Sequence, residues 1–227
     1  MELEVISNNL SNLQTPGFHE MNVSFSSELN SNRPENEILA KAQANIKSGK
    51  TYYNINSGGA SRTDNPTDFA IQGDGYFVIN TANGNRYTRN GSFSVNKDRQ
   101  LVTAQGDAVL GESWPITLTS NGQIQVNKDG DVLDQDGQVI DRIRVRDFQD
   151  PQQLVPEGAS YFSDPTGLFK EDSKFSIMQG HLENSNVSLV ENITRIIQVS
   201  RAYESIQKSL KQQVEASKML NQLPKIS

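Results

Sequence analysis

The sequence predicts a mainly β fold with terminal α-helices. A central β-rich hairpin domain, forming a sheet or partial barrel, is expected between N- and C-terminal helices that form coiled coils. Apolar residues near both ends recur at spacings of three and four, which places one apolar stripe on each helix. Between the ends, short alternating segments are separated by Asn-Gly and Asp-Gly pairs, which favour tight hairpin turns. A domain with such ends is suited to assembly rather than to catalysis.

The predicted N-terminal helix is short. It should end near Gln14, because Thr15-Pro16-Gly17 follows and the residue before a proline disfavours helical backbone. Its apolar stripe consists of Leu3, Ile6, Leu10 and Leu13.

The predicted C-terminal helix is long. It should begin near Val187 or Ser188, with Asn186 or Ser188 as its N-cap, and end before Pro224. At about 1.5 Å per residue it would measure roughly 50 Å. Most amphipathic helices cover their own core, but the length of this heptad pattern favours an intersubunit coiled coil. Its stripe consists of Leu189, Ile196, Val199, Tyr203, Ile206, Leu210 and Leu220, with Ile193 alongside.

Four regions are expected: an N-terminal helix in 1–25, a flexible connection in 26–61, the β-rich domain in 62–178 and an assembly helix in 179–227. Segment 37–47 could form a short helix within the connection, and 147–174 is expected to be extended chain and loops. The strands predicted in the β-rich domain are 76–80, 86–88, 92–95, 100–103, 116–119, 123–126 and 139–148.

A short repeat lies within the β-rich domain. FSVNKD at 93–98 recurs as IQVNKD at 124–129, and the apolar and glycine positions stay in step beyond it. Two copies of a strand-turn unit in one sheet or barrel would explain this, and chance similarity between hairpins is the alternative. Two copies are too few for a solenoid, which needs at least three.

Composition excludes several classes of function. A net charge of −6 and a pI near 5.0 disfavour nucleic acid as a partner. No run of 18 apolar residues is present, so no membrane insertion is expected, and the first residues do not resemble a cleavable signal peptide. Cysteine is absent, which rules out disulfides and thiol chemistry.

The candidate sites are better explained as turns. Gly73-Asp74-Gly75 lacks the third glycine and the following helix that a phosphate loop requires. Segment 127–137 (NKDGDVLDQDG) has Val132 and Gln138 where a calcium loop needs glycine and glutamate.

Nor does any group of side chains indicate catalysis. His19 and His181 are the only histidines, and both lie beside predicted helix ends. Arg142, Arg144 and Arg146 alternate along one predicted strand, which indicates a solvated face or, alternatively, a surface for an acidic partner. We therefore expect no catalytic residues, no cofactor and no metal site.

Three separate segments resemble the bacterial flagellar axial proteins, the family of basal-body rod and hook subunits. EVISNNLSNLQTPGF at 4–18 is similar to the N-terminal signature of that family. DFAIQGDGYFVI at 68–79 and YTRNGSFSVNKDRQLVT at 87–103 are similar to its central β motif. QG at 179–180, ENSNV at 183–187 and RAYE at 201–204 resemble its C-terminal signature, whereas 26–61 and 147–174 resemble nothing identifiable.

The resemblance implies a structural subunit of the basal-body rod that transmits torque. Its partners would be copies of itself, other rod proteins and the flagellar type III export apparatus, through which it would pass unfolded without signal cleavage. Chain length and the sequence at 73–76 are most like the proximal rod member, with the distal rod member next and the longer hook protein less similar. Family members usually carry more helix ahead of the segment that matches Glu4.

The expected mechanism of assembly uses both ends. Alone, each apolar stripe gains too little to offset its ordering entropy, so both ends should be poorly ordered in a free subunit. Between subunits the N-terminal stripe would pack on the C-terminal one, and heterologous contacts that do not close a ring build a helical filament. Two other classes stay open: a secreted β-rich adhesin or carbohydrate-binding module, and a β-rich hydrolase.

Overall fold

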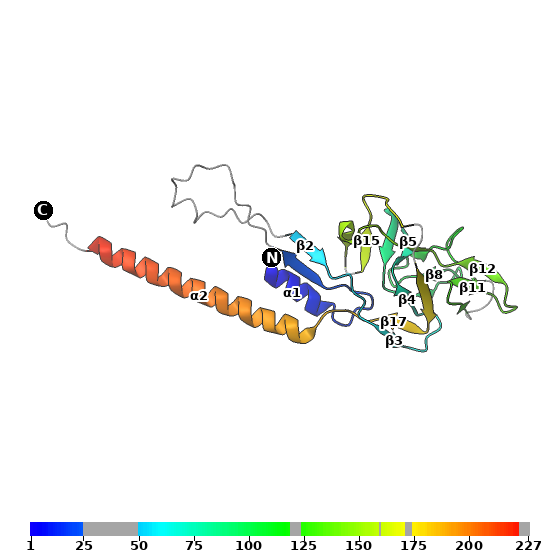
Figure 1. Cartoon of the computed structure of the whole chain (residues 1–227), viewed down its shortest axis with the longest axis horizontal. Coiled ribbons are helices and arrows are strands. Elements are labelled where there is room, and N and C mark those ends of the chain that lie inside the picture. Colours follow the sequence, from blue (N-terminus) through cyan, green and yellow to red (C-terminus); the bar gives the residue numbers. More distant parts are fainter. Residues whose placement is uncertain (25–49, 119–123, 159, 171–173, 223–227) are drawn as a thin grey trace.

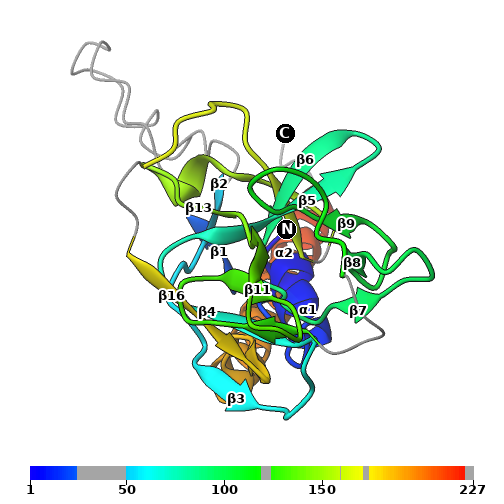
Figure 2. The ribbon, with the colours of Figure 1, turned by 90° about the vertical axis from the view of Figure 1, so that its right-hand side faces the viewer.

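The molecule is elongated, with a β-rich body at one end and a long helix projecting from it. The computed structural model describes residues 1–24, 50–118, 124–158, 160–170 and 174–222. Figure 1 shows α2 (Leu189–Gln222) extending away from the body, with α1 (Glu2–Ser11) beside its first part. Viewed along the long axis from the β-rich end, the strands lie in front of both helices (Figure 2). The prediction of a mainly β fold with helices at both ends is confirmed.

The strands are short, and one 3₁₀ turn, η2 (Pro151–Gln153), interrupts them. They are β1 (Met21–Ser24), β2 (Lys50–Tyr53), β3 (Ala60–Arg62), β4 (Phe69–Gly73), β5 (Tyr76–Thr81), β6 (Gly84–Thr88), β7 (Ser94–Val95), β8 (Leu101–Val102), β9 (Ala108–Val109), β10 (Gln125–Val126), β11 (Asp131–Leu133), β12 (Val139–Arg142), β13 (Val145–Arg146), β14 (Val155–Glu157), β15 (Tyr161–Ser163), β16 (Phe175–Gln179) and β17 (His181–Glu183).

The largest sheet has the order β14-β15-β6-β5-β9-β8-β7, and β13 also pairs with β5. Smaller sheets are β10-β11-β12, β1-β2, β16-β4 and β17-β3. These sheets are open, so the structure has no closed barrel in its described part. The strand pairings are antiparallel, as expected for strands joined by tight turns.

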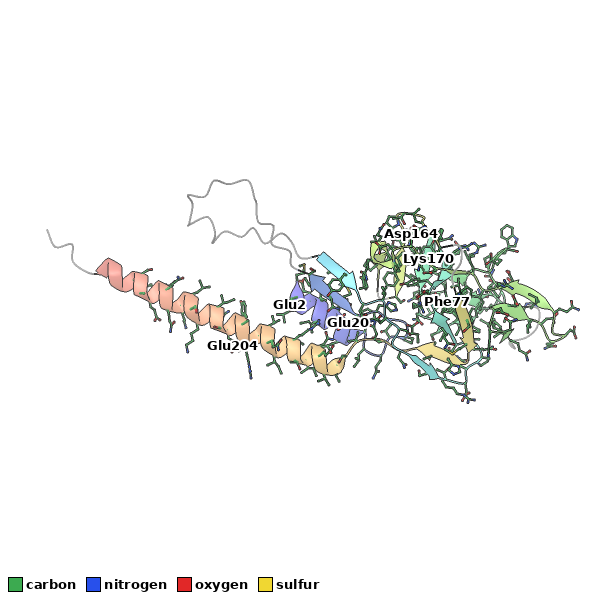
Figure 3. The ribbon with its side chains drawn as sticks, viewed as in Figure 1. Glu2, Glu20, Phe77, Asp164, Lys170 and Glu204 are labelled. Carbon is green, nitrogen blue, oxygen red and sulfur yellow. The ribbon has the colours of Figure 1, made fainter. Side chains whose placement is uncertain are left out.

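Strand β5 is the centre of the core because it is buried on both faces. Phe77 and Ile79 point into one apolar cluster, whereas Tyr76 and Val78 point into a second. Side chains alternate along a strand, so a continuous apolar run covers both faces. Figure 3 shows Phe77 deep within the β-rich body.

The sequence repeat corresponds to a repeated structure. Strands β7-β8-β9 and β10-β11-β12 each pair in chain order. The Oδ1 atom of Asn96 accepts hydrogen bonds from the backbone N–H of Asp98 and Gln100, at 2.9 Å each. Asn127 does the same in the second copy, at 3.0 and 2.9 Å. Each asparagine side chain thus closes the turn of its own hairpin.

Several predicted strands differ from the structure. The expected strand 139–148 is divided into β12 and β13. Of the expected strand 116–119, residues 116–118 contain only the isolated bridge of Thr117 to Gln100, and 119 and 123 lie outside the described residues. Segment 26–61, expected to be a flexible connection, contains β2 and most of β3; the possible helix 37–47 lies outside the described residues. Segment 147–174 contains η2, β14 and β15. Strand β3 pairs with β17 and β15 with β6, both distant in sequence, so local patterning does not reveal those pairings.

Candidate functional site: the junction of the two chain ends

The apolar stripe of α1 is only partly free. Ile6 is 1% exposed, so it is covered by its own chain and is not available to a neighbour. Leu10 and Leu13 are half-buried, and Leu3 is 48% exposed. The N-terminal segment was expected to be poorly ordered in a free subunit, but here α1 packs on α2 within one chain.

The stripe of α2 is covered near the body and exposed beyond it. Asn192 is fully buried and bonds Asn9 of α1, and Ile196 and Val199, in the next two turns of α2, are half-buried. Leu189 and Ile193 are exposed at the start of the helix. The helix includes Leu220, but its side chain lies outside the described residues. Beyond α1 the exposed apolar residues are Tyr203 (62%), Ile206 (58%), Leu210 (55%) and Val214 (54%).

The covered and exposed parts belong to one continuous face of α2. Asn192, Val199 and Ile206 are spaced by seven, as are Ile196, Tyr203 and Leu210. Residues seven apart differ by only about 20° around an α-helix, so both series lie on one side. Figure 3 shows the side chains around Glu204 standing free of any other described element. The face that α1 covers therefore continues outward without a cover.

Buried asparagines connect α1 and α2 with β1. The side-chain N–H of Asn9 donates to the carbonyl of Met21 at 2.8 Å and to Oδ1 of Asn192 at 3.3 Å. Met21 returns a backbone hydrogen bond to Asn9 at 2.9 Å, and Asn192 donates to Glu20 at 3.0 Å. Buried polar groups are costly unless they are paired, so this network fixes the register between the three elements.

Asn186 and Ser188, the two expected caps, have different roles. Ser188 Oγ accepts from the backbone N–H of Glu191 at 3.4 Å and caps α2. Asn186 accepts from the backbone N–H of Glu20 at 2.6 Å and donates to the carbonyls of Asn54 and Asn56. Asn186 therefore joins both chain ends to the segment after β2.

A buried ion cluster holds the junction to the β-rich body. The Glu183 carboxylate lies 3.3 Å from Arg89 and 3.7 Å from Nε2 of His19, and all three side chains are buried. Arg89 also donates to the carbonyls of Ile71 and Gly73, and its guanidinium lies 5.3 Å from the ring centroid of Tyr76. The cluster thus joins the N-terminal segment, the β domain and the C-terminal segment.

The charges in this cluster support one another. Burial acts to raise the pKa of the Glu183 carboxyl, but the interactions with His19 and Arg89 together outweigh it, so that pKa lies below its usual range. Burial raises the pKa of the Tyr76 hydroxyl to about 12, so tyrosine is neutral here. Glu183 is therefore an ionised carboxylate that has compensating partners inside the protein.

Sequence patterns did not identify these polar residues as part of a site. Glu183 and Arg89 are 94 residues apart, and Asn9 and Asn192 are 183 apart, so only the fold brings them together. One local signal was available. Asn9 and Asn192 interrupt apolar stripes on their helices, and a polar residue on an apolar face often pairs with another one across it.

The three arginines that alternate along the sequence have partners within the chain. Arg142 pairs with Asp131 at 2.6 Å, Arg144 bonds the carbonyl of Glu112, and Arg146 lies over the Phe169 ring.

The other candidate motifs form turns, as predicted. Gly73 is the last residue of β4 and Gly75 immediately precedes β5, and both have positive φ at this turn. Segment 127–137 forms hairpin turns, the second closed by Asp134, whose carboxylate accepts from the backbone N–H of Gln138.

Gly17 should be essential for the contact between the N-terminal segment and the body. Its φ is +67°, and a Cβ there would lie 2.3 Å from the backbone carbon of Arg89. Gly17→Ala should therefore cost several kcal/mol, because it adds a backbone clash to conformational strain. Gly137→Ala is the matched control, since Gly137 has φ +77° but open space around it, and only the strain of about 1 kcal/mol should remain. Urea denaturation compares the two, and equal losses would contradict the clash.

Comparison with known proteins identifies the family of the chain. A profile described as the flagellar hook protein FlgE/F/G D1 domain matches residues 70–133, and one described as the flagellar basal body rod FlgEFG protein C-terminal matches 178–223. The FlgF basal-body rod protein of Mesorhizobium japonicum is 34% identical over 95% of this chain and 88% of its own length. The chain belongs to the flagellar basal-body rod protein family.

Two rod proteins of Caulobacter vibrioides are similar to the chain as well. Its FlgF is 30% identical over 96% of this chain and 89% of its own length, and its FlgG is 31% identical over 90% and 86%. Membership of this family identifies a structural protein of the flagellar basal body rather than an enzyme, and implies assembly with other rod and basal-body proteins. In the part of the chain that the structure describes, no helix is both long and apolar enough to cross a bilayer.

The two matched profiles cover different parts of the fold. Residues 70–133 contain the core strand β5 and both copies of the repeat, whereas 178–223 contain β17 and α2. The junction residues Arg89 and Glu183 lie in different profiles. The buried ion cluster therefore connects the two matched segments of this chain.

Proposed function

We propose that the protein is a structural subunit of the flagellar rod, which assembles axially with copies of itself through its terminal helices and transmits torque. The observation that carries this proposal is the exposed apolar face of α2 beyond α1, formed by Tyr203, Ile206, Leu210 and Val214. Soluble proteins rarely leave an apolar series of this kind open to water without a partner for it.

The physical basis for assembly is the burial of this face. Covering apolar surface contributes about 25 cal/mol per Å², and an aligned stripe on a rigid helix loses little conformational entropy on docking. If this face of one subunit packs against a different surface of the next subunit, the contact is heterologous. Repeated heterologous contacts build a filament when they do not close into a ring. Leu3, still exposed on α1, is positioned to extend the contact.

Torque transmission requires a rigid link between the helix and the β domain. The asparagine network and the Glu183–Arg89–His19 cluster supply such a link, because both are buried and join elements far apart in sequence. Twisting α2 relative to the body would break these paired polar groups, which is costly in a dry interior. Force applied to the helix thus passes to the body.

We favour the proximal over the distal rod position. The supporting observations are the 34% identity to the Mesorhizobium japonicum FlgF over 95% of the chain and the sequence at 73–76. The two Caulobacter vibrioides proteins, at 30% for FlgF and 31% for FlgG, do not separate the two positions. We further propose that the protein is exported by the flagellar type III apparatus without cleavage of its N-terminus, and that it lies in the part of the rod that spans the periplasm.

Purified basal bodies test the function directly. The protein should be present in basal bodies freed of membrane, with its N-terminus uncut, because an axial subunit is retained after the lipid is removed. Disabling the flagellar export apparatus should leave it in the cytoplasm. The measurement is mass spectrometry of basal bodies and cell fractions. A protein missing from basal bodies, or secreted normally without the export apparatus, would contradict the proposal.

A further inference from the structure

The turn between β5 and β6 carries an Asn-Gly pair, Asn83-Gly84, that is exposed to solvent. Thr81 pairs with Gly84 at the end of the β5–β6 ladder, so Ala82 and Asn83 form a two-residue loop, and all of 82–85 is exposed. An Asn-Gly pair suits a tight turn because both residues tolerate unusual backbone angles. Asparagine is also chemically labile, and its role in the turn makes no use of that reactivity.

Asn83 is held through its backbone and not through its side chain. Its N–H donates to Oγ1 of Thr81 at 3.3 Å, and its carbonyl accepts from Nη1 of Arg86 at 3.0 Å. Its side-chain amide has no hydrogen bond to any residue in the described part of the chain. Gly84 has φ +97°, and the nearest atom to a Cβ placed there would be Nη1 of Arg86, at 3.9 Å. Neighbouring side chains therefore do not obstruct the approach of the Asn83 side-chain carbonyl to the Gly84 nitrogen.

This approach leads to a spontaneous reaction whose only co-reactant is water. The backbone nitrogen of Gly84 gives its proton to hydroxide and attacks Cγ of Asn83. The new N–Cγ bond forms as the Cγ–Nδ2 bond breaks, and the departing nitrogen takes a proton from water and leaves as ammonia. Water then opens the resulting cyclic imide at either of its carbonyls. The products are aspartate and isoaspartate, in which the main chain runs through Cγ.

The same dipeptide at Asn90-Gly91 is protected by the fold. Oδ1 of Asn90 accepts from the backbone N–H of Ser92 at 3.0 Å, and Gly91 is buried. A Cβ on Gly91 would lie 1.7 Å from the carbonyl oxygen of Phe69, and the Gly91 carbonyl accepts from the Phe69 N–H at 3.0 Å. Ring closure there would have to break this pairing and displace β4. The turn pair needs only a local opening at the end of its ladder, which is far less costly. The third pair, Asn121-Gly122, lies outside the described residues.

A product at position 83 would lie beside Arg86. Nη1 of Arg86 bonds the carbonyls of Asn83 and Asn85 at 3.0 Å each, while its Nε bonds Glu157 of β14 at 2.6 Å. A carboxylate at 83 is a second acid within reach of this guanidinium, and isoaspartate also lengthens the main chain of the loop by a methylene. Both changes weaken the hold of Arg86 on β14, which is an edge strand of the largest sheet.

We propose that Asn83 is a modification site of the folded protein, where aspartate and isoaspartate form spontaneously and loosen β14 through Arg86. Three observations support the site: an exposed amide without a hydrogen bond in the described chain, open space at the following glycine, and the protection of the same dipeptide at Asn90. No enzyme is required, so the extent of modification increases with the age of each chain. The reaction occurs within one chain, so the inference does not rest on the proposed rod function.

Incubation of the purified full chain at mildly alkaline pH, in buffer and in urea, tests the site. Peptide mass spectrometry follows the loss of each asparagine, and labelling by an isoaspartyl methyltransferase detects isoaspartate. In buffer, Asn83 should be converted several-fold faster than Asn90. In urea, where the fold protects neither pair, the two should be converted at similar rates. An Asn83 that is as stable in buffer as Asn90 would overturn the proposal.

Hydrogen exchange tests the effect on β14. After conversion of the chain in buffer, the backbone amides of β14 and β15 should exchange faster than in fresh protein. Asn83→Ser is the matched control, because serine suits an exposed turn but has no amide to lose. The same incubation should leave the exchange of this variant unchanged. Converted chains whose β14 and β15 exchange as slowly as in fresh protein would overturn the link through Arg86.

Discussion

Glu183→Gln should lower the free energy of unfolding by about 3–5 kcal/mol. Glu183 is 1% exposed and is the carboxylate partner of buried Arg89. Glutamine has nearly the same shape but no charge, so the guanidinium would stay buried without its counter-ion, which is the costly way to break a buried pair. Urea unfolding of the purified chain, followed by circular dichroism, measures the loss.

Glu157→Gln is the matched control for this prediction. Glu157 also pairs with an arginine, Arg86 at 2.6 Å, but its side chain is 41% exposed. Water and salt weaken such a surface pair, so its removal should shift the unfolding midpoint far less. Similar losses in the two variants would show that the junction cluster has no special importance.

The acid dependence of stability gives a further check on Glu183. Its pKa is held below the usual range in the folded protein, whereas in the unfolded chain it should be near 4.3. The unfolded state therefore binds this proton first, so the stabilisation is complete above about pH 4.3 and is lost as the pH falls through the folded pKa. The difference between wild type and Glu183→Gln should shrink as the pH is lowered below about 4.

Local sequence patterns predicted the hairpins well because their signals are local. Asn96 and Asn127 close turns with their own side chains, so the repeated NKD sequence alone indicated both hairpins. Strands such as β4 and β16 escaped prediction for the opposite reason. They pair with each other although about a hundred residues separate them, so no tight turn joins them and no local signal indicates the pairing.

The candidate site was predicted in part. Heptad spacing predicted one apolar stripe on α2, but it could not show that Ile196 is half-buried and Leu210 exposed. The boundary between the covered and the exposed part of α2 depends on where Asn9 and Asn192 meet, which is a tertiary contact. Arg89 and Glu183 could not be predicted for the same reason. A charged residue is usually solvated, and its burial is tolerated only when the fold places an oppositely charged residue next to it.

The exposed part of α2 should be needed for assembly but not for folding. In Ile206→Asp with Leu210→Asp, two carboxylates would be buried without compensation wherever a neighbour packs on this face, at a cost of several kcal/mol. Both side chains are more than half exposed in the single chain, so the monomer should unfold at nearly the wild-type midpoint. Light scattering, a motility assay and monomer melting curves measure the three properties.

Two controls define which face of α2 is involved. Ser205→Asp with Gln212→Asp adds the same charge on the opposite side of the helix, where both residues are exposed, and should preserve assembly. Ile196 lies on the same stripe but is half-buried, so Ile196→Asp should also lower the melting temperature of the monomer. If the double variant at 206 and 210 melted as low as Ile196→Asp, the stripe would be covering the subunit's own core. If it assembled normally, the helix face would not be the contact between rod subunits.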